Sequence, residues 1–204
     1  MIAFLHTSSI HIDNFENLVR KFNKNIDIKH FVNADILCYA LDKGFTDDNS
    51  FENEVAKIKE FNPDLIICTC STYGAACDKN NSIERIDYPI AEFLVTNFTK
   101  IGLVYTATST KKVSKDLLLR IAKEQNKTIQ IVDCDCSCAW TYYESIEFDK
   151  YEKSIGEKIK EFEDKVEVVF LAQASMEGAK KYLTNFSKGI YSSPEFGIQE
   201  YLKN

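Results

Sequence analysis

The chain has 204 residues, of which 45% are hydrophobic and 27% are charged, and these ordinary values exclude a disordered, collagen-like or coiled-coil protein. The formal net charge of −6 and the presence of only three arginines argue against an extended nucleic-acid surface. The length fits one large domain or two small fused ones.

No stretch approaches the ~20 apolar residues of a membrane span, and the N-terminus lacks the basic start and long apolar run of a signal peptide. We therefore expect a cytoplasmic protein that does not enter a membrane. The chain has seven cysteines, and this odd count without a signal peptide favours reduced thiols. The glycine spacing excludes the two standard nucleotide-binding fingerprints.

Short apolar runs rich in β-branched residues alternate with amphipathic segments of helical spacing. The runs predict strands at residues 2–6, 27–32, 64–69, 101–106, 128–133, 166–172 and 188–191. The intervening segments predict helices at residues 13–24, 50–61, 84–98, 111–125, 149–164, 176–185 and 194–203. This alternation indicates an α/β fold with mostly parallel sheets.

The order of these elements repeats along the chain. The second and third strands start 25 and 62 residues after the first, and the fifth and sixth start 27 and 65 residues after the fourth. We therefore predict two pseudo-symmetric βαβαβ-type lobes, one made of residues 1–97 with 187–204 and the other of residues 98–186. Because parallel strands present their carboxyl ends and helix N-termini at one edge, we expect an anionic ligand in a cleft between the lobes.

Cys70 lies just past a predicted strand, in the segment CTCSTYG. A thiol in this position meets solvent and the free N–H groups of a helix start, which stabilise a thiolate. Cys70 is therefore the candidate nucleophile or base, and we expect it to be the most reactive thiol. Cys68 points to the same side two residues deeper and is interpreted as part of the core.

The other thiols are given no catalytic role. Cys134, Cys136 and Cys138 form a C-x-C-x-C pattern, whereas structural zinc sites use C-x₂₋₄-C pairs, so no metal is assigned. A soft-metal or redox role remains the alternative. Cys38 and Cys77 are interpreted as filler or surface thiols.

Of three further polar side chains, only His6 has both a functional and a structural interpretation. His6 ends the first strand and could orient or activate a group in the cleft, or serve only as a structural histidine. His30 is interpreted as strand surface. Asp87 is interpreted as a helix cap or as the salt-bridge partner of Arg85.

Five segments taken together resemble the aspartate/glutamate/hydantoin racemase superfamily, in the right order and over nearly the whole chain. They are CTCSTYG, RIDYPIAEFL, IGLVYTATST, VFLAQASMEGA and SSPEFGIQEY. The resemblance implies two similar lobes with a ligand between them, no cofactor, and chemistry at a carbon next to a carboxylate. Two-base members carry one cysteine per lobe, and Cys70 matches the first. Gln173 stands at the position of the second, and a glutamine cannot be a general base.

The resemblance also implies hydroxyl groups around the ligand carboxylates. The substrate-binding candidates are Thr7, Ser8, Ser71, Thr72, Thr106, Thr108, Ser109, Ser175 and Ser192. Each of them could instead serve only as a helix cap.

The leading hypothesis is a cofactor-independent racemase- or isomerase-like enzyme that acts on a small amino acid or dicarboxylate. Cys70 and Gln173 are its candidate catalytic residues, with Gln173 donating a hydrogen bond rather than exchanging a proton. The alternatives are a single-thiol decarboxylase and a non-catalytic protein that binds small carboxylates. The expected partner is the substrate, with neither nucleic acid nor membrane, and a homodimer is one possible assembly.

Overall fold

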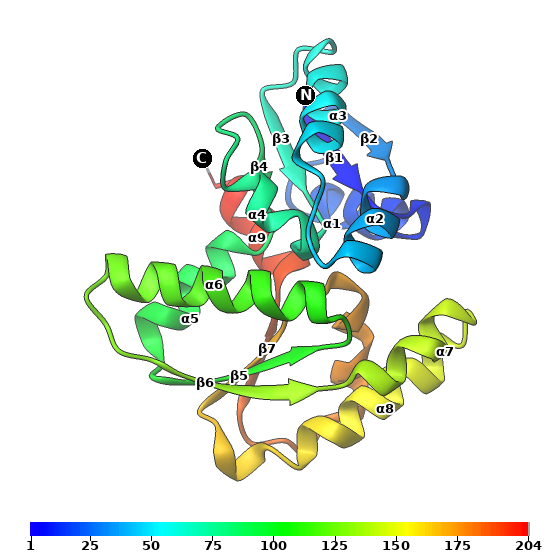
Figure 1. The fold of residues 1–204 in the computed structure, drawn as a ribbon. Helices are drawn as coiled ribbons and strands as arrows, with labels where there is room; N and C mark the ends of the chain where they lie inside the picture. Colours follow the sequence, from blue (N-terminus) through cyan, green and yellow to red (C-terminus); the bar gives the residue numbers. More distant parts are fainter. Residues whose placement is uncertain (204) are drawn as a thin grey trace. The chain divides into compact units, whose positions relative to one another are not determined.

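The computed structural model describes residues 1–203, and the chain divides into two compact units. The first unit is Met1–Pro89 together with the segment that begins at Pro194, and the second is Ile90–Ser193. Each unit has its own parallel sheet flanked by helices, so the predicted α/β class is confirmed (Figure 1).

The first unit contains a four-stranded parallel sheet of order β2-β1-β3-β4. Its strands are β1 (Ile2–His6), β2 (Ile28–Val32), β3 (Leu65–Cys68) and β4 (Glu84–Arg85). Its α-helices are α1 (Ile12–Phe22), α2 (Asp35–Lys43), α3 (Asp48–Lys59), α4 (Gly74–Cys77) and α9 (Ser193–Tyr201), and its 3₁₀ turns are η1 (Ser9–His11) and η2 (Ser71–Tyr73).

Side chains along β1 alternate between the two faces of this sheet. Ala3 and Leu5 pack in a cluster with buried side chains of α2 and α3. Phe4 and His6 lie toward α1, where the ring of Phe15 is 5.5 Å from that of Phe4 and 5.4 Å from that of His6. All residues of β1 are buried, as expected for a central strand of a parallel sheet covered on both faces.

The second unit repeats this arrangement with the sheet order β6-β5-β7-β8. Its strands are β5 (Lys100–Tyr105), β6 (Gln130–Asp135), β7 (Val168–Leu171) and β8 (Gly189–Ser192). Its helices are α5 (Tyr88–Asn97), α6 (Thr108–Glu124), α7 (Trp140–Glu144) and α8 (Phe148–Lys160), with 3₁₀ segments η3 (Ser137–Ala139), η4 (Glu163–Lys165) and η5 (Ala174–Tyr182). The same strand order in both units agrees with the repeat predicted from the spacing of the strands.

The unit boundaries differ from the predicted ones. Residues 187–193 were assigned to the first lobe, but β8 pairs in parallel with β7, with Leu171 opposite Ser192, and so belongs to the second sheet. The second unit also begins at Ile90, within α5, rather than at residue 98. The hydrogen bonds between β7 and β8 therefore determine that residues 189–192 belong to the second sheet.

Several short elements were not predicted. β4 has two residues, too few to show a pattern, and residues 84 and 85 had been placed in a helix. α2 was missed although its ends carry standard signals: the side chain of Asn33 accepts from the backbone N–H of Asp35 at 3.1 Å, and Gly44 ends the helix with a φ of 80°. α7 was missed because one and a half turns show no periodicity.

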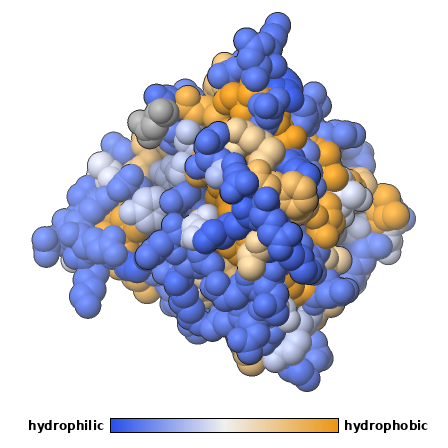
Figure 2. Space-filling model, turned by 90° about the horizontal axis from the view of Figure 1, so that it is seen from above, coloured by the Kyte–Doolittle hydropathy of each residue, from blue (hydrophilic) through white to orange (hydrophobic). Residues whose placement is uncertain are grey.

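The face shown in Figure 2 is mainly hydrophilic, with hydrophobic residues lying between the hydrophilic ones. Within residues 1–203 no helix combines the length and the apolar composition needed to cross a membrane.

Candidate active site

The carboxyl ends of β1 and β3 bring two polar segments of the first unit to one edge of its sheet. Leu5 lies opposite Cys68 in the parallel register, and the backbone N–H of Thr69 donates to the carbonyl of Leu5 at 3.0 Å. The segment after β1 begins with Thr7 and Ser8, and the segment after β3 runs from Thr69 to η2. Two groups of predicted site residues therefore leave the same edge of this sheet.

Cys70 is half-buried and lies directly before η2 in an extended conformation, with φ −103° and ψ 113°. Burial raises the pKa of its thiol to about 12, and the neighbouring Cys68 adds to this effect. Hydrogen bonds from the backbone N–H groups of Thr72 and Tyr73 act in the opposite direction, as predicted for a helix start, but they do not outweigh desolvation. The structure therefore differs from the expectation of a lowered pKa at Cys70.

The candidate hydroxyl residues near Cys70 in the sequence and at the end of β1 differ in burial and in hydrogen-bond partners. Ser71 is 5% exposed, and its hydroxyl has no hydrogen-bond partner within residues 1–203. Thr72 is also buried, and its carbonyl accepts from the hydroxyl of Thr46 at 3.2 Å. Ser8 caps η1 by accepting from the N–H of Ile10, and Thr7 is half-buried. A buried hydroxyl without a partner requires an explanation, and a bound ligand would supply one at Ser71.

His6 is fully buried at the end of β1 and contacts groups that the sequence did not reveal. Its Nδ1 lies 2.9 Å from the hydroxyl of Thr69, and its Nε2 lies 2.8 Å from Nδ1 of His30. His30 is half-buried, not strand surface as predicted, and its Nε2 lies 3.1 Å from a carboxylate oxygen of Glu16. Burial, followed by His30 and His11, lowers the pKa of His6 to about 3, so this histidine is neutral.

Asp87 has the structural role of an ion-pair partner of Arg85, one of the two roles predicted from the sequence. Its carboxylate is fully buried and accepts two hydrogen bonds from the Arg85 guanidinium, at 2.7 and 2.9 Å. Arg85 also donates to Asp78 at 2.8 Å. The predicted salt bridge with Arg85 is confirmed.

In the second unit, Thr106 and Gln173 follow β5 and β7 and contact each other. The backbone N–H and the hydroxyl of Thr106 both donate to Oε1 of Gln173, at 2.7 and 3.0 Å. The phenol oxygen of the buried Tyr151 lies 3.4 Å from the Thr106 hydroxyl and 2.9 Å from that of Ser175. Sequence analysis missed Tyr151, which lies on α8 and carries no motif.

The remaining hydroxyl candidates of the second unit have different surroundings. Ser109 is 6% exposed in the first turn of α6, and its hydroxyl has no partner within the described residues, whereas Thr108 is exposed. Ser192 donates to the carboxylate of Glu177 and accepts from the ammonium of Lys180 at 2.8 Å. Ser192 therefore already has two internal partners.

The C-x-C-x-C segment continues from the end of β6. Cys134 and Cys136 are buried with their sulfurs 4.0 Å apart, and Cys138 is exposed. The hydrogen bond with Cys134, followed by burial, raises the pKa of Cys136. No group of three His, Cys, Asp or Glu side chains suited to a metal ion occurs within residues 1–203. Cys68 lies in the core of the first unit, as predicted.

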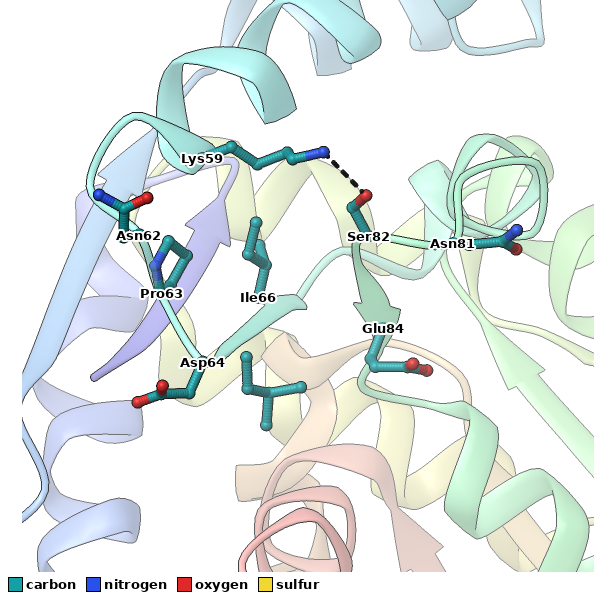
Figure 3. A pocket seen from close by; sticks show the side chains of 9 residues that line it. Lys59, Asn62, Pro63, Asp64, Ile66, Asn81, Ser82 and Glu84 are labelled. Carbon is teal, nitrogen blue, oxygen red and sulfur yellow. Dashed lines mark hydrogen bonds between the residues drawn. The ribbon is translucent and has the colours of Figure 1, made fainter.

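Two hollows of the first unit lie away from these residues. One, of about 370 Å³, lies at the amino ends of β3 and β4, and the hydrogen bond between Lys59 and Ser82 crosses its rim at 3.2 Å (Figure 3). The other, of about 400 Å³, lies beside α2 and α3 and is lined by residues such as Tyr39 and Glu54. Neither is lined by a predicted site residue.

Solved structures share the fold of this chain. Aspartate racemase from Picrophilus torridus superimposes with a TM-score of 0.76 at 14% identity, covering 99% of this chain and 92% of that one. Glutamate racemase from Thermus thermophilus, in complex with beta-chloro-D-alanine, gives 0.73 at 15% identity, covering 99% and 78%. Allantoin racemase from Klebsiella pneumoniae gives 0.60 at 14% identity, covering 99% and 86%.

No protein-family model matches the chain, and no curated protein matches it in sequence. The chain nevertheless shares the fold of these aspartate, glutamate and allantoin racemases, as the resemblance of the five sequence segments predicted. The class defined by the fold is a chain of two α/β units, each with a four-stranded parallel sheet.

Proposed function

We propose that the protein catalyses a cofactor-independent, racemase- or isomerase-like reaction at the carbon next to the carboxylate of a small amino acid or dicarboxylate, with Cys70 as the acid/base group. The observation that carries this proposal is the setting of Cys70. Its thiol lies at the carboxyl end of a parallel strand, accepts hydrogen bonds from the start of η2, and neighbours the buried, unpartnered hydroxyl of Ser71.

The polar groups next to Cys70 suit a substrate anion. Removing a proton next to a carboxylate leaves an enediolate with two negative oxygens, which needs donors already in place. The Ser71 hydroxyl is such a donor in the first unit, whereas the N–H groups of Thr72 and Tyr73 already donate to the Cys70 thiol. Ser109 of the second unit also has an unpartnered hydroxyl, and we propose it as a hydrogen-bond donor to a ligand carboxylate.

The protonation state of Cys70 favours an amino acid as substrate. With a pKa of about 12, the free thiol is protonated at neutral pH and is not a base. A cationic substrate ammonium group beside it would favour loss of the thiol proton to water, because an opposite charge lowers a thiol pKa. The thiolate would then take the α-proton, leaving an enediolate, and the thiol would return a proton to the same carbon.

Gln173 is proposed to hold a substrate oxygen. Its Oε1 accepts from Thr106, so the two N–H bonds of its amide are the donors that remain for a ligand. An amide does not exchange protons usefully near neutrality, so Cys70 alone would handle the proton. The expected chemistry is therefore confined to one face of the substrate carbon.

A second candidate, a single-thiol decarboxylase, is favoured by the same protonated thiol. In such a reaction a carbon–carbon bond of a malonate-like diacid breaks, CO₂ leaves, and its bonding electrons remain as an enediolate. The Cys70 thiol then protonates the carbon and is reprotonated by water. A group with a raised pKa is suited to this donor role.

Incubation in D₂O with amino acids and malonate-type diacids tests the proposal. Deuterium in the recovered amino acid, lost in Cys70→Ala and retained in Cys138→Ala, is expected for the racemase-like enzyme. Release of CO₂ with one deuterium of single configuration in the product would identify the decarboxylase. Tight binding without exchange or CO₂ release would contradict both and identify a carboxylate-binding protein.

A further inference from the structure

A chain of hydrogen bonds connects β1, β2 and α1 to the residue that precedes Cys70. The hydroxyl of Thr69 lies 2.9 Å from Nδ1 of His6, Nε2 of His6 lies 2.8 Å from Nδ1 of His30, and Nε2 of His30 lies 3.1 Å from Oε2 of Glu16. The imidazole rings stack with centroids 5.1 Å apart. Arg20 donates to the other oxygen of Glu16 at 3.0 Å. None of these contacts is local in sequence except the last.

The directions of these hydrogen bonds depend on how many protons the two imidazole rings carry. The Thr69 hydroxyl also lies 3.1 Å from the carbonyl of Leu5, which can only accept. If Thr69 donates to Leu5, His6 must donate through Nδ1–H and accept at Nε2. His30 must then donate through both nitrogens, to His6 and to Glu16, and is an imidazolium. All four hydrogen bonds are made in this arrangement.

Removing one proton reverses part of the chain. With a neutral His30, the Thr69 hydroxyl donates to Nδ1 of His6, His6 donates through Nε2–H to His30, and His30 donates to Glu16. The side-chain bond from Thr69 to Leu5 is then lost, and only the backbone N–H of Thr69 stays on that carbonyl, at 3.0 Å. The tautomer of His6 therefore reports the protonation of His30.

We propose that His6 and His30 are positioning residues for Thr69 and, through it, for Cys70. In the hydrogen-bonded series from Thr69 to Glu16, His30 carries a proton on both ring nitrogens and pairs with the Glu16 carboxylate. The part that concerns Cys70 rests on the proposed function. Thr69 is 5% exposed and is covalently joined to Cys70. Its backbone N–H and its hydroxyl both bind the Leu5 carbonyl, and two hydrogen bonds fix the backbone next to the Cys70 thiol better than one.

The surroundings place the charge on His30 rather than on His6. His6 has no exposed surface, and the charged or titratable groups acting on it are His30 and His11 of η1, both of which disfavour its protonation. His30 instead faces the carboxylate of Glu16, whose pKa is lowered first by the hydrogen bond with His30 and then by Arg20. Of the two imidazoles, His30 lies beside the carboxylate of Glu16, and it therefore carries the positive charge.

Histidine tautomers are read directly by two-bond ¹H–¹⁵N correlation spectra of ¹⁵N-histidine-labelled protein, recorded from pH 5 to 9. We expect His6 as the neutral Nδ1–H tautomer whenever His30 carries both ring protons, and as the Nε2–H tautomer whenever His30 is neutral. Glu16→Gln, which keeps an acceptor but removes the charge, should increase the share of His6 in the Nε2–H tautomer. Asp13→Asn, an exposed change on the same helix, should leave that share unchanged.

A second pair of variants tests the link to Thr69. Thr69→Val removes the hydroxyl at nearly constant shape and should favour the Nε2–H tautomer at every pH, whereas Thr69→Ser should behave as the wild type. A His6 tautomer that stays Nε2–H throughout, or two histidines that titrate independently, would overturn the proposed chain. If exchange activity is found, Thr69→Val should lower kcat at least tenfold and Thr69→Ser should restore it. Equal activity of both variants would overturn the positioning role, while the spectra test the chain even if no substrate reacts.

Discussion

Thr106 donates both its backbone N–H and its hydroxyl to the same side-chain oxygen of Gln173, at 2.7 and 3.0 Å. A backbone N–H can only donate, so the atom that faces it is the amide oxygen and not the amide nitrogen. The orientation of this amide is thereby determined, and its nitrogen keeps two hydrogens for another acceptor. A residue that cannot act as a base is thus held as a hydrogen-bond donor.

Gln173→Glu should weaken the binding of a carboxylate ligand at least tenfold. The variant keeps an oxygen facing Thr106 but replaces the amide donors with a negative charge, and an unpaired or repelled charged group costs about 1–3 kcal/mol or more. Isothermal titration with the reactive substrate measures the effect. Gln199→Glu, an exposed change of the same charge, serves as the control and should bind as the wild type does. Unchanged affinity in Gln173→Glu would place Gln173 outside the binding site.

Gln173→Cys should raise racemisation, because a second thiol supplies the proton donor that the wild type lacks. Cys70→Ala should abolish proton exchange in the wild-type background and racemisation in both backgrounds. The measurement is α-proton exchange and chirality for each enantiomer of a reactive amino acid. Fast symmetric racemisation by the wild type that survives in Cys70→Ala would show that the chemistry lies on another residue.

Alkylation at pH 7.5 should modify the exposed Cys138 and Cys38 well before Cys70. With a pKa of about 12, the ionised fraction of the Cys70 thiol is on the order of one in ten thousand at pH 8. The rate at which Cys70 is labelled should therefore rise about tenfold per pH unit. Mass spectrometry of iodoacetamide-treated peptides gives the order. Preferential labelling of Cys70 at neutral pH would instead support the lowered pKa expected from its position at a strand end.

Lowering the pH should destabilise the first unit through His6. Its pKa is about 3 in the folded chain and 6.5 in the unfolded chain, so between these values the unfolded state binds an extra proton. The contribution of His6 is fully present above pH 6.5 and is lost by about 1.4 kcal/mol per pH unit as the pH falls toward 3. Urea unfolding from pH 7 to 4.5 should show a shallower pH dependence in His6→Gln than in the wild type. Identical slopes would contradict a buried neutral His6.

Asp87→Asn should cost about 3–5 kcal/mol of unfolding free energy, because it leaves the buried Arg85 guanidinium without its main partner. Glu200→Gln, which removes an exposed ion pair with Lys203, should cost less than about 1 kcal/mol. Chemical denaturation at constant pH compares the two variants. A loss as small as that of Glu200→Gln would show that the buried pair does not stabilise the first unit.

Local patterns were enough to predict the class of fold. The apolar runs of β1, β3, β5 and β7 pass through buried sheets, and such runs are visible in sequence because every side chain in them except the first of β3 and of β5 is buried. Their spacing also predicted the repeat. α2 could have been found from Asn33 and Gly44, whereas the two-residue β4 exists only through its pairing with β3.

The sequence by itself determined that Cys70 and Gln173 each follow a buried strand, because this depends only on position along the chain. Only the tertiary structure decided the state of these groups. Residues 67 positions apart orient the Gln173 amide, residues 24 positions apart join His6 to His30, and burial outweighs the N–H groups that favour a Cys70 thiolate. Hydrogen-bond direction and desolvation depend on atoms brought together by folding, and no local pattern contains them.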